Sequence, residues 1–275
     1  MNIAAPTCRW HDKAAKLSFE GRLFIDGDFR EAISGAKFET INPANDSIIA
    51  AISRGDAADI DLAVASARRA FKSGAWSRLA PRTRMAVMLR FADLIEKHAE
   101  EFALLDTIDM GKPIQEMLAV DIPLALTCIR FTAECIDKIE GSVGATANDV
   151  LSYVIHQPLG VVGCIVPWNY PLLMTVWKIA PALAAGNSVV LKPAEQSPLS
   201  ALLLARLFVE AGGPAGVLNV VNGFGAEAGK ALALHGGVDK IAFTGSAEVG
   251  KLMLIYAGQS NMKKVATECG GKSPH

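Results

Sequence analysis

The spacing of apolar residues changes along the chain, from a helical period to alternating strands and helices. In the first half, apolar side chains recur three and four positions apart after Asp56, a typical N-cap residue. A similar stripe runs from Pro81, well suited to a first helical turn, through Ala99. A third helix is expected after the Gly111–Pro113 interruption, ending near Glu140. We interpret these three helices as structural, with solvated charged faces.

The second half of the chain alternates short apolar runs with helical patterns. The runs start roughly 25 residues apart, which is the spacing of βαβ units. The sequence therefore predicts an α/β fold with a Rossmann-like, doubly wound parallel sheet. The expected strands are Val161–Val166, Ser188–Leu191, Val217–Val221, Lys240–Phe243 and Lys264–Thr267. The expected helices between and after them are Leu172–Ala185, Pro198–Ala211, Ala226–Leu234 and Ala247–Ala257.

Two hairpins interrupt this pattern. Asp26-Gly27 is a two-residue turn signal between short apolar stretches, and Asn148-Asp149 separates two alternating stretches within Gly141–Gln157. An isolated two-stranded ribbon is marginal in water, so the second hairpin must pack on something. A satellite hairpin of its own domain and an oligomer contact both fit this pattern, and composition does not choose between them.

Composition narrows the class of protein. The chain has 275 residues, 51% of them hydrophobic, and 27 basic side chains balance 28 acidic ones, for a net charge of −1. Such a chain can bury a large core, and it lacks the clustered basic charge that a nucleic acid requires. We therefore expect no nucleic-acid partner.

Cysteine usage and hydropathy point to a reducing, aqueous compartment. The five cysteines are scattered without metal-binding spacing, so free thiols and no metal site are expected. The stretch Gln157–Trp177 contains no charged residue, but its three prolines break any continuous membrane helix. No secretory signal is visible at the amino terminus. We expect a cytoplasmic protein with no membrane partner.

Candidate chemistry follows the ends of the predicted strands, where doubly wound sheets bind ligands. Asn169 lies between two prolines after the first strand and offers an oxyanion donor or a purely structural amide. Lys192 and Glu195 follow the second strand, as ribose ligands or as a solvated ion pair. Glu268, at the end of the fifth strand, is a candidate general base.

Glycine-rich turns follow the other two strands. Residues 223–229 read GxGxxxG, one residue longer than the dinucleotide fingerprint, and a tight strand-to-helix turn explains this motif equally well. Gly245 and Ser246 open the next helix, as a phosphate site or as an ordinary N-cap. Each signal is moderate, and their placement on five successive strand ends makes them strong together.

In this order the motifs PWNYP, KPAEQSP, GFGAEAG, FTGS and ECGGKSP resemble the aldehyde dehydrogenase superfamily. The resemblance covers nearly the whole chain, and stretches such as RLFIDGDF and GQSNMKKV are similar to the bacterial γ-glutamyl-γ-aminobutyraldehyde dehydrogenases. It implies oxidation of an aldehyde to a carboxylic acid with NAD or NADP, and here an aminoaldehyde from putrescine or polyamine breakdown. In that family a cysteine thiolate attacks the aldehyde, hydride passes to the nicotinamide, and activated water hydrolyses the thioester.

The resemblance also implies roles for individual residues. Asn169 corresponds to the oxyanion donor and Glu268 to the general base, while the charge of Glu195 favours NAD because a 2′-phosphate would meet it. The remaining positions correspond to residues around the cofactor, and with Glu195 they are Ile165, Pro167, Trp168, Lys192, Gly225, Gly229, Gly245, Ser246 and Gly270.

The family's nucleophilic cysteine lies beyond the GGKSP motif, so the resemblance implies a division of the chain. Residues 1–140 form the N-terminal helical part of the cofactor domain, 141–158 an oligomerisation ribbon, 159–270 the dinucleotide-binding part, and 271–275 the start of a missing catalytic domain. We expect a cofactor-binding chain that is inactive alone and forms a homo-oligomer, dimer or tetramer, if the ribbon is paired. One alternative is a non-catalytic protein that assembles with full-length subunits through the ribbon. Another is a self-sufficient enzyme using Cys269 or Cys164.

Overall fold

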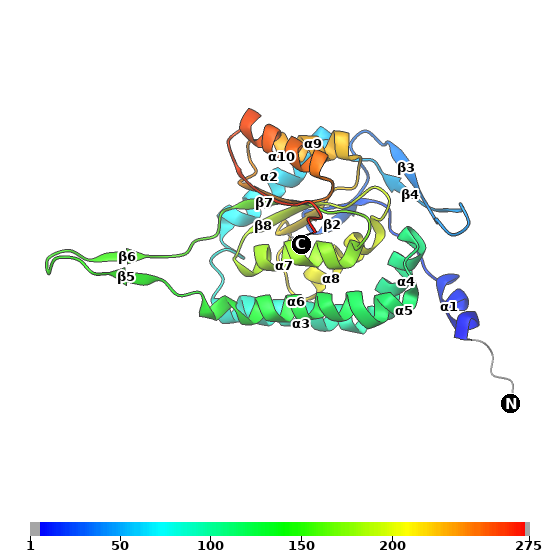
Figure 1. Cartoon of the computed structure of the whole chain (residues 1–275), viewed down its shortest axis with the longest axis horizontal. Helices are drawn as coiled ribbons and strands as arrows, with labels where there is room; N and C mark the ends of the chain where they lie inside the picture. Colours follow the sequence, from blue (N-terminus) through cyan, green and yellow to red (C-terminus); the bar gives the residue numbers. More distant parts are fainter. Residues whose placement is uncertain (1–5, 273–275) are drawn as a thin grey trace.

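A seven-stranded sheet crosses the centre of the protein, in a computed structural model that describes residues 6–272 (Figure 1). Its strand order is β11-β10-β7-β8-β9-β1-β2. The first five of these strands are parallel, and an antiparallel hairpin, β1 and β2, extends the sheet beyond β9. The strands are β1 (Leu23–Ile25), β2 (Asp28–Arg30), β7 (Val161–Ile165), β8 (Ser188–Lys192), β9 (Leu218–Val220), β10 (Lys240–Thr244) and β11 (Lys264–Glu268).

The sheet is covered on both faces, which explains why its central strands are apolar throughout. In β7 the side chains of Val162 and Cys164 join one hydrophobic cluster, whereas Val161 and Ile165 join the other. Successive strand residues point to opposite faces, so a strand between two layers needs apolar residues at every position. Every residue of β7 and β8 is buried.

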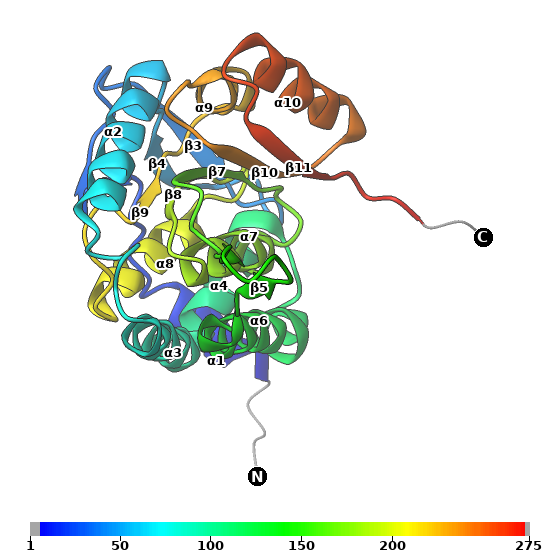
Figure 2. The same cartoon turned by 90° about the vertical axis from the view of Figure 1, so that its left-hand side faces the viewer.

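Helices form a layer on each side of the sheet (Figures 1 and 2). One layer packs α7 and α8 against β7–β9 and is backed by α3, α4 and α6, while the other contains α2, α9 and α10. This arrangement confirms the predicted doubly wound α/β fold. The helices are α2 (Ala57–Ser73), α3 (Pro81–Lys97), α4 (Ala99–Met110), α6 (Ile122–Glu134), α7 (Pro171–Ala184), α8 (Leu199–Glu210), α9 (Lys230–Leu234) and α10 (Ala247–Gln259).

Short elements complete the chain. A helix that was not predicted, α1, begins the described chain, and a second hairpin, β3 with β4, packs beside the sheet. Two π-helical turns, η1 and η3, precede α6 and α9, and a 3-10 turn, η2, follows α6. Their bounds are α1 (Pro6–Ala14), β3 (Lys37–Ile41), β4 (Ile48–Ser53), α5 (Ile114–Glu116), η1 (Met117–Asp121), η2 (Ile136–Lys138) and η3 (Gly225–Gly229).

The helix boundaries of the first half differ in two places from those predicted. The stripe expected to continue through Ala99 is broken at His98, whose φ of −97° and ψ of 18° leave the helical region and start α4. The third long helix ends at Glu134 rather than near Glu140. The predicted N-cap at Asp56 is confirmed, because its side chain accepts a hydrogen bond from the amide of Ala58.

The ribbon projects from the body of the molecule (Figure 1). It consists of β5 (Ser142–Gly144) and β6 (Ser152–Val154), which pair in antiparallel register and are exposed along their whole length. The turn predicted at Asn148-Asp149 joins them. No helix among residues 6–272 is long and apolar enough to cross a membrane.

Candidate active site at the carboxyl edge of the sheet

The candidate residues share one edge of the sheet, because the five parallel strands all end there. Strand β7 lies between β8 and β10, and the helices that follow β7 and β10 pack on opposite faces of the sheet. The chain therefore reverses its winding direction between β7 and β10. A reversal of this kind opens the crevice in which doubly wound proteins bind ligands.

Lys192 and Glu195 form a hydrogen-bonded ion pair at the end of β8. The ammonium donates to Glu195 Oε2 at 2.9 Å, and its side chain is 3% exposed against 28% for the carboxylate. Burial lowers the pKa of Lys192, and the carboxylate of Glu195 opposes that change. The predicted solvated pair is thus wrong for the lysine, which is buried. Gly229 lies beside it, since a Cβ there would come within 3.7 Å of Lys192 Cδ.

The ends of β9 and β10 each lead into a helical turn. Gly225 opens η3 and is exposed with no atom in the space a Cβ would fill, so a ligand can approach its backbone closely. Ser246 caps α10, its hydroxyl accepting from the amide of Val249 at 3.2 Å. Gly245, just before it, has the ring of Phe243 folded against it. The positive end of α10 therefore points to this edge, as a phosphate requires.

Asn169 lies on an exposed turn between β7 and α7. Within the described part of the chain its side-chain amide makes no hydrogen bond, which leaves it available as a donor and removes the structural explanation for it. Ile165 and Pro167, at the start of this turn, are buried and half-buried, and Trp168 is 53% exposed. Ser197 donates to the carbonyl of Trp168 at 3.5 Å, so the turns after β7 and β8 touch.

Glu268 ends the edge strand β11 with an exposed side chain. Its Oε1 accepts from the amide of Gly270, whose φ of +69° lies in the region that favours glycine. On α7, burial lowers the pKa of Lys178, and the carboxylate of Glu268 opposes that change. Lys178 itself lines a separate hollow together with Trp177, Lys240 and Ala266.

Sequence reasoning missed Lys178, although a signal was present. It is the one charged residue between Gln157 and Leu191, in a stretch otherwise made of apolar and uncharged polar side chains. A lone lysine in such a stretch must find water, a partner or a functional role, because burying an unpaired ammonium is costly.

Neither candidate thiol is placed as a nucleophile. Cys164 lies in the middle of β7 with no exposed surface, and burial raises its pKa to about 12. Cys269 turns toward α10, where its sulfur fills the space beside Gly250. It therefore points to the α10 side of the sheet, while the neighbouring residue Glu268 points the other way, as successive strand residues do. A thiol acts through its thiolate, and a pKa near 12 leaves almost none at neutral pH.

The structure brings only some of the predicted site residues together. Trp168, Glu195 and Phe224 line a common hollow of about 630 Å³ between the strand ends and β3. Asn169 and Glu268 remain on different strands, with β10 between β7 and β11. No cluster of metal-ligating side chains occurs among residues 6–272.

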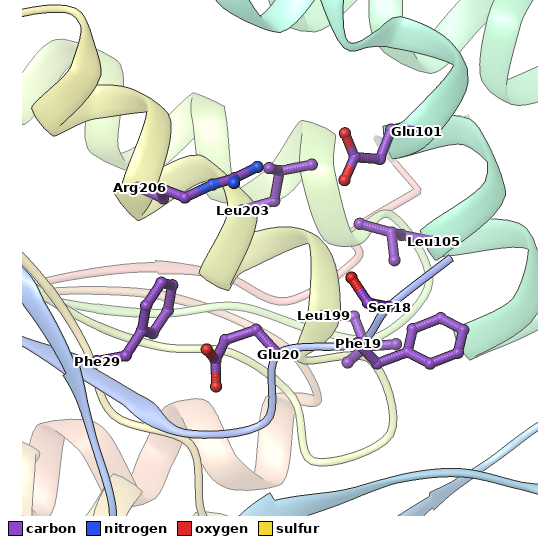
Figure 3. A pocket seen from close by; sticks show the side chains of 9 residues that line it. All are labelled: Ser18, Phe19, Glu20, Phe29, Glu101, Leu105, Leu199, Leu203 and Arg206. Atoms are coloured by element: carbon purple, nitrogen blue, oxygen red, sulfur yellow. The ribbon is translucent and has the colours of Figure 1, made fainter. Parts of the chain in front are cut away.

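A second hollow, of about 350 Å³, lies away from the strand ends (Figure 3). It is formed by the chain before β1 together with β2, α4 and α8, and Arg206 and Glu101 face it. Its two carboxylates are engaged, Glu20 with Arg22 and Glu101 with His98. Ser18 gives it one hydroxyl, but no histidine among residues 6–272 lines the hollow to activate that group, so it does not compete with the strand ends as a candidate site.

Comparison with known proteins gives one consistent family. The aldehyde dehydrogenase family matches residues 29–275. The NADP/NAD-dependent aldehyde dehydrogenase PuuC of Escherichia coli is 54% identical over 264 residues, which are 96% of this chain and 53% of that protein. A cysteine-to-alanine variant of the P. syringae indole-3-acetaldehyde dehydrogenase AldA, solved with NAD+ and IAA, is 54% identical with a TM-score of 0.96, covering 97% of this chain and 54% of that one.

A third relative is named for the substrate class that the motifs suggest. The γ-glutamyl-γ-aminobutyraldehyde dehydrogenase of Burkholderia cenocepacia is 52% identical, with a TM-score of 0.95 over 97% of this chain and 54% of that one. The chain therefore spans about half the length of the relatives it matches.

Proposed function

Because this chain belongs to the aldehyde dehydrogenase family, we propose that it is the dinucleotide-binding portion of an enzyme that oxidises an aldehyde to a carboxylic acid. The observation that carries the proposal is the gathering of Asn169, Lys192, Glu195, Ser246 and Glu268 at one edge of a doubly wound sheet. Its relatives are named as NADP/NAD-dependent or were solved with NAD+.

The residues of this edge fit a dinucleotide. Glu195 presents a half-exposed carboxylate beside a buried lysine, a pair suited to the two hydroxyls of a ribose. Gly225 is open to close approach, and Ser246 stands at the positive end of α10 for the pyrophosphate. The negative charge of Glu195 favours NAD over NADP, whose 2′-phosphate it would repel.

The chemistry divides between the cofactor and the chain. NAD or NADP supplies the hydride acceptor when bound. Asn169 donates its amide to the oxygen of the reacting carbonyl, where negative charge develops. Glu268 takes the proton from the water that hydrolyses the acyl intermediate.

The nucleophile is assigned outside these 275 residues. Cys164 is sealed in the core and Cys269 packs against α10, so neither supplies the thiolate that attacks the aldehyde. The assignment is supported by the length of the relatives, about half of which this chain does not span.

The proposed substrate is an aminoaldehyde from putrescine or polyamine breakdown, on the strength of the Burkholderia cenocepacia relative. Next to Asn169, the side chain of Tyr170 is 38% exposed and offers an aromatic surface for the carbon chain of that substrate. We place the enzyme in the cytoplasm, where the free thiols of Cys128, Cys135, Cys164 and Cys269 remain reduced.

The proposal predicts saturable NAD binding that depends on Glu195. Calorimetric titration of the 275-residue chain should show binding that Glu195→Ala weakens about tenfold, since hydrogen bonds to charged groups contribute about 1.5–3 kcal/mol. Glu210→Ala, an exposed glutamate at the far end of α8, is the matched control and should leave binding unchanged. A folded chain without NAD affinity would refute the proposal.

NADH formation that disappears in Cys269→Ala would refute the assignment of the nucleophile.

A second function, assembly through the ribbon, rests on a separate observation. The ribbon presents a group of apolar side chains that are each at least 54% exposed: Val143, Val150, Leu151, Tyr153, Val154 and Ile155. Such a surface on a projecting element is typical of a protein contact. The proposed contact is with another subunit, either a second copy in a homo-oligomer or a full-length relative in a mixed one.

A further inference from the structure

Two carboxylates of α4 cap the two helices that follow the site loops. Asp106 Oδ2 accepts from the amide of Leu172 at 3.1 Å, and Asp109 Oδ2 accepts from the amide of Leu199 at 3.1 Å. Leu172 lies in the first turn of α7 and Leu199 begins α8. Both carboxylates come from a helix that carries none of the candidate site residues.

The need for these caps follows from the prolines at both helix starts. Pro171 and Pro198 have no N–H, so Leu172 and Leu199 supply the first amide donor after each proline. No side chain of either helix's own N-cap residue satisfies these donors. A buried amide without an acceptor is costly, and the acceptor here comes from another part of the chain.

The two carboxylates are placed to act together. They lie three residues apart on α4, which puts them on the same face of that helix. Asp106 is fully buried and Asp109 is 2% exposed. Asp109 also accepts through Oδ1 from the hydroxyl of Thr40 at 2.6 Å, which fixes the carboxylate from its other side.

The capped amides anchor the turns that carry the site. The turn before Leu172 contains Asn169, and the turn before Leu199 contains Glu195. A third contact supports the first turn, where the ammonium of Lys112 lies 3.4 Å from the ring centroid of Tyr170 and is paired with buried Asp121 at 2.6 Å. Cation–π contacts of this kind strengthen when water is excluded.

We propose that Asp106 and Asp109 are positioning residues, which hold the Asn169 turn and the Glu195 turn in the geometry that binds the dinucleotide. The inference rests on the proposed function, and it adds two buried residues that act through the helix starts; Asp109 also borders the hollow lined by Trp168 and Glu195. Losing a cap frees the turn to leave the competent geometry, and apparent affinity falls in proportion to the competent fraction.

The test compares NAD affinity of the 275-residue chain across matched variants. Asp109→Ala should weaken NAD binding about fivefold, the range expected for a lost helix cap. Asp109→Asn should recover most of the affinity, because an amide oxygen still accepts from Leu199. Asp239→Ala is the control: its carboxylate accepts from the amide of Val161 at the opposite end of β7, and its loss should leave affinity unchanged.

Three outcomes would overturn the inference. Asp109→Ala could leave NAD affinity unchanged, Asp109→Asn could lose as much NAD affinity as Asp109→Ala, or Asp239→Ala could lose as much NAD affinity as Asp109→Ala. If the wild-type chain binds no NAD, the proposed function fails, and hydrogen exchange then decides the inference by itself. Asp106→Ala should speed exchange at residues 166–174 and Asp109→Ala at residues 193–200, each selectively. Acceleration spread evenly over the sheet would show general destabilisation instead.

Discussion

At the scale of single residues, burial separates the carboxylates that hold the site from those that act in it. Glu195 and Glu268 are partly or fully exposed at the sheet edge, whereas Asp106 and Asp109 are enclosed behind it. Burial raises the pKa of both enclosed groups to about 7, although hydrogen bonds from Leu172 and Leu199 oppose the change. They are thus poised to change charge near neutral pH.

This shift predicts that stability falls as pH rises. Between about pH 4 and 7 the folded chain keeps protons on Asp106 and Asp109 that the unfolded chain has already released, so folding is favoured at the acid end. Each unit of pKa difference corresponds to about 1.4 kcal/mol. Urea unfolding at pH 5 and pH 8 measures how much the free energy of unfolding falls between these two pH values. The fall should be smaller in the double variant Asp106→Asn, Asp109→Asn than in the wild type, because asparagine mimics the protonated acid. An identical fall in the free energy of unfolding in the wild type and in the double variant would contradict the raised pKa values.

At the scale of elements, the sequence predicts the second half closely and the first half only in part. The five strands and three of the four helices that follow them occur within one or two residues of the predicted bounds, because strands buried on both faces appear in the sequence as continuous apolar runs. The helix predicted from Ala226 begins at Lys230, since residues 225–229 form the π-helical turn η3. The break between α3 and α4 at His98 was missed, because the apolar stripe continues across this position. Only the backbone angles of His98 leave the helical region. The π-helical turns carry no periodic signal of their own.

The ribbon supplies a prediction at this scale. Val143 and Tyr153 face each other across its two strands and are 74% and 63% exposed. Replacing both by serine should lower the mass of the assembly, because apolar side chains buried at a subunit contact would be lost. Light scattering after gel filtration measures this mass. Ile33→Ser, at a residue 58% exposed on the body, is the control. An unchanged mass in the ribbon variant would show that the ribbon does not hold the assembly together.

At the scale of the whole molecule, topology explains why the site could be predicted in outline but not in detail. Five strand ends on one edge follow from the alternation of strands and helices, and this brings Lys192, Gly229 and Ser246 to the same edge. The role of buried Asp106 was not predictable, because it meets the first turn of α7 only through a contact between distant segments. The three N-terminal helices were expected to have solvated charged faces, and this was wrong for Asp106, Asp109 and Asp121, which are buried.

The most direct test of the account is hydrogen–deuterium exchange of the 275-residue chain with and without NAD. We predict slower exchange in the presence of NAD at residues 165–169, 192–196, 224–229 and 244–250, all at the carboxyl edge of the sheet. Exchange at residues 18–20 and 203–206, which border the hollow of Figure 3, should not change. Protection confined to that hollow, or no protection in a folded chain, would contradict the assignment of the strand ends as the cofactor site.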